Sequence, residues 1–127
     1  MVILDTNIII DHLRQKNQNT HLKKITKKTK QQLAISIISI QELFTGKSTK
    51  KPINENYLLT IINSLNILSY TYQISKLAGE INRDLKNPIE FADSAIAATT
   101  IINNAKLFTL NSKHFQKISN LPLLPLL

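Results

Sequence analysis

The chain opens with an uninterrupted apolar run, Val2-Ile3-Leu4, that stops at the acidic residue Asp5. A run without polar alternation is typical of a strand that is buried on both faces, as in a parallel sheet covered by helices. Open α/β sheets bind ligands at the carboxyl ends of their strands, which gives Asp5 a position suited to function. A structural role stays open as well, because Asp is a good N-cap for the short helix predicted over residues 8–14.

Apolar strands alternate with helical patterns along the rest of the chain. Further strands are predicted at 33–36, 67–70 and 107–110, and helices at 21–30, 37–45, 57–65, 73–86 and 91–103. A polar loop is expected at 46–54, a short helix or turn at 112–118, and an edge strand in the Pro-containing tail after Asn120. With 127 residues, the chain is expected to form one α/β domain whose mainly parallel sheet lies between helices.

The composition excludes several classes of protein. The chain has no cysteine, which excludes disulfides and Cys-based zinc sites and fits a reducing compartment. Its apolar runs all fall short of the roughly 18 residues of a membrane span. The first strand begins almost at residue 1, which leaves no room for a signal peptide. A cytoplasmic location is therefore predicted.

Positive charge is concentrated in one part of the chain. The 16 Lys and Arg residues outnumber the 8 acids, which gives a net charge of +8. Ten of these 16 bases lie between Arg14 and Lys51, where Glu42 is the single acid. Solubility alone is one explanation, but a surface that binds a polyanion accounts better for the uneven distribution. The candidate nucleic-acid contacts are Lys23, Lys24, Lys27, Lys28, Lys47, Lys50 and Lys51.

Three of the eight acids occupy positions that solvation does not explain. Asp5 ends a buried strand, Glu42 lies early in the helix after the second strand, and Asp93 begins a helix too apolar to be exposed. In a parallel sheet these positions meet at one edge, and clustered carboxylates call for a cation such as Mg²⁺ or Mn²⁺. Such a metal site can activate water to cut a phosphodiester. Structural alternatives are a capping box between Ser39 and Glu42 and a helix-dipole contact for Asp93.

At these positions the chain resembles the PIN-domain ribonucleases, and among them the small VapC-like toxins of toxin–antitoxin pairs. Four blocks in the family's order carry the resemblance: 3–7 with 10–11, 39–43 with Gly46, 93–99, and 107–111 with 114–115. The resemblance implies a PIN-like three-layer α/β/α sandwich over residues 1–127. It also implies a Mg²⁺- or Mn²⁺-dependent endoribonuclease with Asp5, Glu42 and Asp93 as catalytic, metal-binding acids, a cognate antitoxin as partner, and a homodimer.

The family often has a fourth acid after the last strand, where this chain has Asn111. Asn111 is therefore expected to contact the metal through water. Thr6 and Thr109 match threonines of the family that orient carboxylates or water. A separate indication of self-association is the apolar load of the helix at 57–65, whose residues Leu58, Leu59, Ile61 and Ile62 exceed what one buried stripe needs. Packing of these residues in the chain's own core is the alternative.

Other functional classes fit the sequence less well. Phosphatases of the aspartyl-phosphate type need a second Asp two residues after the first, where this chain has Asn7. Two glycines in all are too few for a Gly-rich phosphate loop. His12, His21 and His114 lack metal-site spacing and are interpreted as surface or nucleic-acid-facing residues. A non-catalytic RNA- or DNA-binding module with structural acids remains the alternative, and divalent-metal binding would distinguish it from the nuclease.

Overall fold

Four short strands form one parallel sheet in the computed structural model, which describes residues 1–15 and 18–127. They are β1 (Val2–Leu4), β2 (Leu33–Ser36), β3 (Asn66–Leu68) and β4 (Lys106–Phe108), in the order β3-β2-β1-β4. β1 pairs with β2 on one side, with Val2 opposite Leu33, and with β4 on the other, with Leu4 opposite Phe108. The first strand is therefore central, and the chain changes direction across the sheet between β1 and β4.

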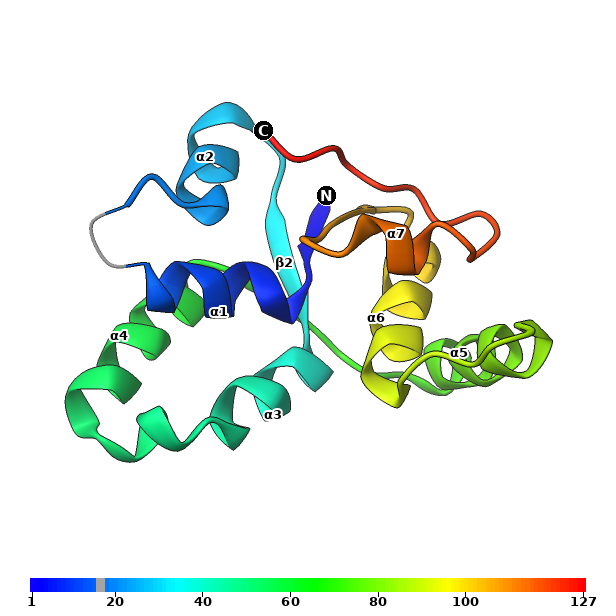
Figure 1. The fold of residues 1–127 in the computed structure, drawn as a ribbon, viewed down its shortest axis with the longest axis horizontal. Coiled ribbons are helices and arrows are strands. Elements are labelled where there is room, and N and C mark those ends of the chain that lie inside the picture. The colour runs from blue at the N-terminus through cyan, green and yellow to red at the C-terminus, as the bar shows by residue number, and fades with distance from the viewer. Residues whose placement is uncertain (16–17) are drawn as a thin grey trace.

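Helices cover both faces of this sheet, as Figure 1 shows. One face carries α1 (Thr6–Arg14), α2 (His21–Lys28), α3 (Ile37–Thr45) and α4 (Pro52–Asn63), and the other carries α5 (Tyr72–Asp84), α6 (Phe91–Ile102) and α7 (Ser112–Phe115). Because successive strand residues point to opposite faces, Val2 and Leu4 enter the first core and Ile3 enters the second. The predicted three-layer α/β/α sandwich is confirmed.

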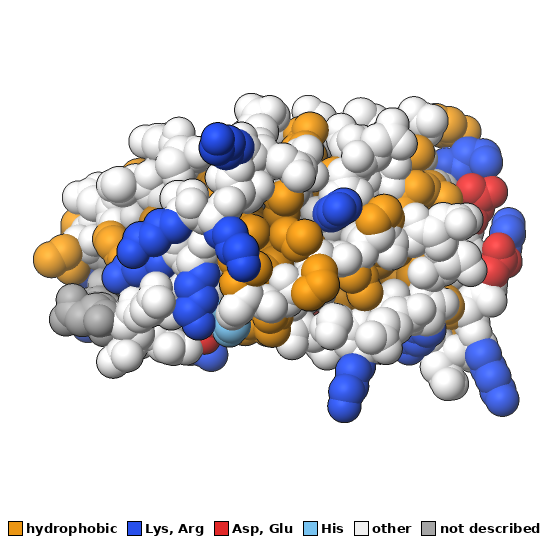
Figure 2. All heavy atoms as spheres, turned by 90° about the horizontal axis from the view of Figure 1, so that it is seen from above, with side chains coloured by type: hydrophobic (Ala, Val, Ile, Leu, Met, Phe, Trp, Pro, Cys, Tyr) orange, Lys and Arg blue, Asp and Glu red, His pale blue; other side chains and the backbone are white. Residues whose placement is uncertain are grey.

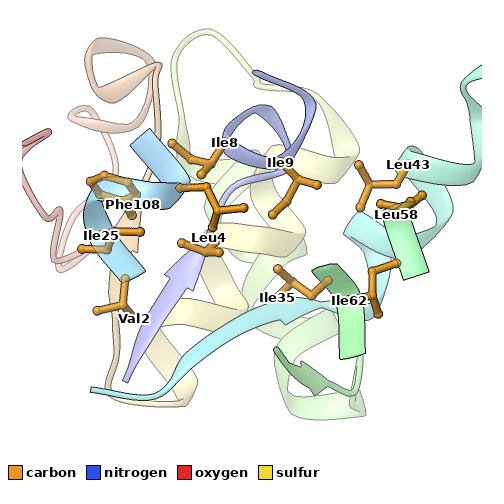
Figure 3. Packing of buried hydrophobic residues seen from close by; sticks show 11 residues of the cluster. Val2, Leu4, Ile8, Ile9, Ile25, Ile35, Leu43, Leu58, Ile62 and Phe108 are labelled. Carbon is orange, nitrogen blue, oxygen red and sulfur yellow. The ribbon is translucent and has the colours of Figure 1, made fainter. Parts of the chain in front are cut away.

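The core on the α1 face is built from long aliphatic side chains. Figure 3 shows Leu4 and Ile35 of the sheet pointing toward Ile8 and Ile9 of α1, with Leu58 of α4 packed beside them. These five side chains are at most 1% exposed. Burial of this kind stabilises a side chain by about 1.5–3 kcal/mol, so α1 is fixed tightly over the end of β1.

The helix predicted at 91–103 is the most deeply buried of the second layer. In α6, all residues from Ser94 to Thr100 are buried. Its two threonines satisfy their hydroxyl groups within the helix, since Thr99 donates to the carbonyl oxygen of Ala95 and Thr100 to that of Ile96. The buried part of α6 begins directly after Asp93, which lies in the first turn of the helix.

Several boundaries differ from the sequence prediction. α4 begins at Pro52 rather than at residue 57, because proline suits the first turn of a helix, and a 3₁₀ helix, η1 (Lys47–Lys50), occupies part of the predicted loop. The tail pairs with β4 as predicted: the Leu107 N–H donates to the Pro122 carbonyl oxygen and the Leu124 N–H to that of Leu107, both at 2.9 Å. Within the described residues, every helix is too short or too polar to cross a membrane.

Candidate active site

Asp5 lies directly after β1, at the carboxyl edge of the sheet. Its backbone N–H donates to the Phe108 carbonyl oxygen at 2.9 Å, which ties the exit of β1 to the end of β4. The side chain is 5% exposed, and its Oδ2 accepts a hydrogen bond from the Thr109 hydroxyl at 2.7 Å. Asp5 does precede α1, but its carboxylate is directed to Thr109 rather than used as a helix cap.

Thr109 is held so that its single hydroxyl hydrogen points to Asp5. Its Oγ1 accepts from the Asn111 backbone N–H at 3.0 Å and is 3.4 Å from the Asn7 side-chain nitrogen. Asn7 in turn accepts the Leu110 N–H at 3.3 Å. A hydroxyl has one donor and two acceptor positions, so with both acceptor positions used the hydrogen is left for the carboxylate.

Glu42 approaches the same edge from α3. The Thr6 hydroxyl is 2.6 Å from its Oε1 and 2.8 Å from the Ser39 hydroxyl. Since Thr6 has one hydrogen, it donates to the carboxylate and accepts from Ser39. The capping-box alternative for Ser39 is wrong, because α3 begins at Ile37 and the cap is Ser36, whose hydroxyl accepts the Ile38 N–H at 3.1 Å.

Asp93 is paired with a histidine that sequence reasoning did not assign to the site. His114 Nε2 lies 2.9 Å from Asp93 Oδ2, and the two side chains are 29% and 25% exposed. The interpretation as a surface or nucleic-acid-facing residue is wrong for His12, which is 8% exposed and is hydrogen-bonded to Thr20 and Tyr57. For the partly exposed His114 it stays a prediction. The signal for His114 in the sequence was its place three residues after Asn111, in the block that follows the last strand.

The three carboxylates share one electrostatic environment. The pKa of Asp5 is raised to about 6, mainly by burial and also by the negative charges of Asp93 and Glu42, while the Thr109 hydrogen bond acts in the opposite direction. The structure thus brings these acids within range of each other's charge. A cation bound among them would relieve the repulsion.

The donor chemistry fits a divalent cation with oxygen preference. Within residues 1–15 and 18–127, no group of three or more acidic or histidine side chains forms a preformed metal site. The reason is visible in the contacts, because Glu42 is turned to Thr6 and Asp93 to His114. Mg²⁺ keeps several waters and is commonly held by one or two carboxylates, so the buried Asp5 with these two acids nearby suits it.

The remaining predicted site residues lie at different distances from this edge. Asn111 is exposed, precedes α7 and contacts Thr109 through its backbone. Lys47, Lys50 and Lys51 follow α3 and lie in or next to η1. The lysines of α2 lie elsewhere: Lys23 and Lys27 line a largely apolar hollow of about 490 Å³ with the residues that begin β2. Figure 2 shows Lys and Arg side chains gathered over the part of the surface that α2 occupies.

The raised pKa of Asp5 predicts how stability depends on pH in the presence of a chelator. The pKa is 3.8 in an unperturbed chain and about 6 when folded, so the folded protein binds more protons between these values. The free energy of unfolding should therefore fall by about 3 kcal/mol as pH rises from about 4 to about 7. Asp5→Asn should flatten this dependence, as measured by urea unfolding, whereas Glu55→Gln on the exposed side of α4 should not. An Asp5→Asn profile parallel to the wild type would contradict the assignment.

Comparison with known proteins agrees with this geometry. Residues 2–121 match the family model described as PIN domain. Ribonuclease VapC2 of Rickettsia felis is 32% identical over 125 residues, which cover 94% of this chain and 92% of that protein. Ribonuclease VapC1 of Methanocaldococcus jannaschii is 31% identical over 121 residues, which cover 92% of this chain and 80% of that protein.

Two solved structures of similar fold are of complexes. A structure of VapBC2 from Rickettsia felis bound to a DNA fragment from their promoter superposes with a TM-score of 0.81 at 31% identity, covering 98% of each chain. DNA-bound VapBC from Salmonella typhimurium gives a TM-score of 0.84 at 26% identity, covering 97% of this chain and 96% of that one. Because the PIN domain model matches nearly the whole length of this chain, the chain belongs to the PIN-domain family.

Proposed function

We propose that this chain is a cytoplasmic, divalent-metal-dependent endoribonuclease that acts as the toxin of a toxin–antitoxin pair. The observation that carries the proposal is the position of Glu42 and Asp93 near the end of β1, where their negative charges both raise the pKa of the buried Asp5 carboxyl. The similarity to proteins named ribonuclease VapC supports RNA as the substrate. A basic chain of net charge +8 suits a polyanionic substrate.

Mg²⁺ or Mn²⁺ would be held by Asp5, Glu42 and Asp93, with Asn111 contributing through water. When bound, such an ion supplies an activated water and offsets the charge that develops on the phosphate oxygens. The chain's own residues hold the carboxylates for this role: Thr109 orients Asp5, and Thr6 orients Glu42. Hydroxyl partners leave the negative charge of the acids intact, which keeps their affinity for a cation.

The reaction that these groups support is hydrolysis of a phosphodiester bond. The oxygen of a water molecule bonds to phosphorus, one phosphorus–oxygen bond to a ribose breaks, and the leaving oxygen takes up a proton. The role of the protein is to place the phosphate at the acidic edge and to hold the acids in position, since catalysis of phosphoryl transfer is largely positioning and charge stabilisation.

The acids themselves provide the first test. Asp5→Asn, Glu42→Gln and Asp93→Asn should each lower the rate of RNA cleavage by more than the roughly 10–100-fold typical of outer-shell metal partners. They should also abolish the rise in thermal stability that Mn²⁺ gives the wild type. Glu55→Gln, an exposed acid on α4, is the matched control and should leave both unchanged. Circular dichroism would establish that each variant folds.

The opposite results would favour the non-catalytic alternative. A wild-type protein that binds RNA with the same affinity in EDTA and in Mn²⁺, and that leaves the RNA intact, would be a binding module with structural acids. Loss of folding in Asp5→Asn, with unchanged specific activity in the residual folded fraction, would make Asp5 structural.

We propose that the hollow beside α2 receives an acidic segment of the antitoxin. The hollow is mostly apolar, with Leu22 and Leu65 in its lining, and Lys23 and Lys27 supply positive charge at the same place. The VapBC complexes among the similar structures support an antitoxin partner. Co-purification with the product of a small gene adjacent to this one, lost in Lys23→Glu/Lys27→Glu, would agree; complex formation indifferent to this double change would move the contact elsewhere.

Self-association is the second part of the proposed assembly. Leu58 and Ile62 pack in the chain's own core, whereas Leu59 is 37% exposed and faces outward. Light scattering at tens of micromolar should give a dimer mass for the wild type. A monomer at these concentrations would argue against a stable homodimer.

The two lysine clusters make separable predictions for RNA binding. Each phosphate contact on a single strand contributes about −0.7 to the slope of log affinity against log salt. Alanine at Lys47, Lys50 and Lys51 should reduce the slope by about 2 if all three contact phosphates. Alanine at the four α2 lysines, Lys23, Lys24, Lys27 and Lys28, should reduce it by about 3 if the RNA reaches that edge. An unchanged slope in either variant would remove that cluster from the RNA surface.

A further inference from the structure

Phe91 is a large aromatic side chain that is mostly outside the hydrophobic core. It is 69% exposed at the first position of α6, whereas Phe108 and Phe115 are 0% and 1% exposed. Single exposed apolar residues are common on protein surfaces, so exposure by itself indicates nothing. Its surroundings are more informative.

Phe91 packs against a second aromatic ring, that of Tyr70, which is partly buried. The rings of Tyr70 and Phe91 have centroids 6.3 Å apart and planes tilted by 52°. Tyr70 follows β3 and packs against the cluster of Ile74, Ala78 and Ala98 between α5 and α6. The Phe91 ring is therefore supported by Tyr70 and still open to solvent over most of its surface. Such a ring loses little conformational entropy when a flat ligand stacks on it.

The position of Phe91 relates it to the acidic edge. Phe91 and Asp93 are two residues apart in the first turn of α6, so their side chains leave that turn on different sides, Asp93 toward His114 and Phe91 toward Tyr70. Tyr70 lies beyond the carboxyl end of β3, at the same edge of the sheet as Asp5 beyond β1. An RNA strand that has a phosphate at Asp93 and crosses the first turn of α6 toward β3 would bring a neighbouring nucleotide to the Phe91 ring.

We propose that Phe91, supported by Tyr70, stacks on an unpaired base of the RNA next to the phosphodiester that is cut. The inference rests on the proposed ribonuclease function and narrows the substrate class to single-stranded or looped RNA, because a base inside a duplex has no free face. Stacking on aromatic side chains tolerates all four bases, so Phe91 sets where an unpaired nucleotide lies rather than which base it is.

A tryptophan at position 91 would report the contact directly. The chain contains no tryptophan, so Phe91→Trp introduces a single indole whose emission is quenched when a base stacks on it. In an Asp5→Asn background that prevents cleavage, a single-stranded oligonucleotide should quench this emission, and a duplex of the same sequence should not. Gly79→Trp on α5 is the matched control, since nothing lies within 4 Å of a Cβ there; its emission should stay constant.

Affinity provides the second readout. Phe91→Leu keeps an apolar side chain but removes the aromatic face, so binding of a labelled single strand should weaken about tenfold or more, whereas Phe91→Tyr should bind as the wild type does. Wild-type-like binding by Phe91→Leu, or unchanged emission of Phe91→Trp at saturating RNA, would overturn the stacking proposal while leaving cleavage by the wild type intact. A wild type that neither binds nor cleaves RNA would overturn the ribonuclease proposal itself.

A second copy of the chain is the competing occupant of this surface. If Phe91 lies in a homodimer interface, the emission of Phe91→Trp should change with protein concentration in the absence of RNA, and Phe91→Leu should lower the mass measured by light scattering. That pair of results would overturn the stacking proposal. Emission independent of protein concentration, together with quenching by RNA, would support it.

Discussion

The burial of one carboxylate, Asp5, is the constraint on which the rest of the site depends. A charged group that is 5% exposed is unfavourable unless its surroundings compensate for lost hydration. The sheet order places β1 between β2 and β4, so its carboxyl end lies where the chain changes direction across the sheet. Ligands of open α/β sheets bind at such points. Topology therefore buries Asp5 and also brings Glu42 and Asp93 near it, so that a cation bound among them would offset the charge.

The three acids are each held by a different neutral or weakly basic partner. Asp5 accepts from Thr109, Glu42 from Thr6, and Asp93 faces His114. A lysine or arginine in these places would hold a carboxylate more strongly but would also neutralise it. Hydroxyl groups orient the oxygens and leave the charge available. Burial is the main cause that raises the pKa of Asp5 to about 6, and the Thr109 hydrogen bond opposes this rise. The same contacts join α1, α3, α6 and α7 to one edge, so the site and the packing of these helices depend on each other.

The sequence predicted the strands and the edge of the sheet where the acids lie, but not the side chains that the acids contact. Unbroken apolar runs located the buried strands, and the acids beside them could be placed at one edge from topology alone. The partners could not be found in this way: Ser39 meets Thr6 across 33 residues, Thr109 meets Asp5 across 104, and His114 meets Asp93 across 21. Local patterns suggested a capping box and a surface histidine, because hydrogen-bonding side chains satisfy local and distant partners equally well.

The basic residues that are close together in the sequence are divided between separate parts of the fold. Ten of the 16 bases fall in one stretch of sequence, yet the fold sends α2 to the start of β2 and η1 to the far end of α3. Exposed charges act over a Debye length of about 8–10 Å at ordinary salt, which is shorter than the separation of most surface features in a domain. The net charge of +8 therefore does not act as one field, because each basic cluster affects only its own surroundings. The neighbours of each cluster differ: an apolar hollow lies beside α2, whereas η1 borders the last turn of α1 at Leu13 and Arg14.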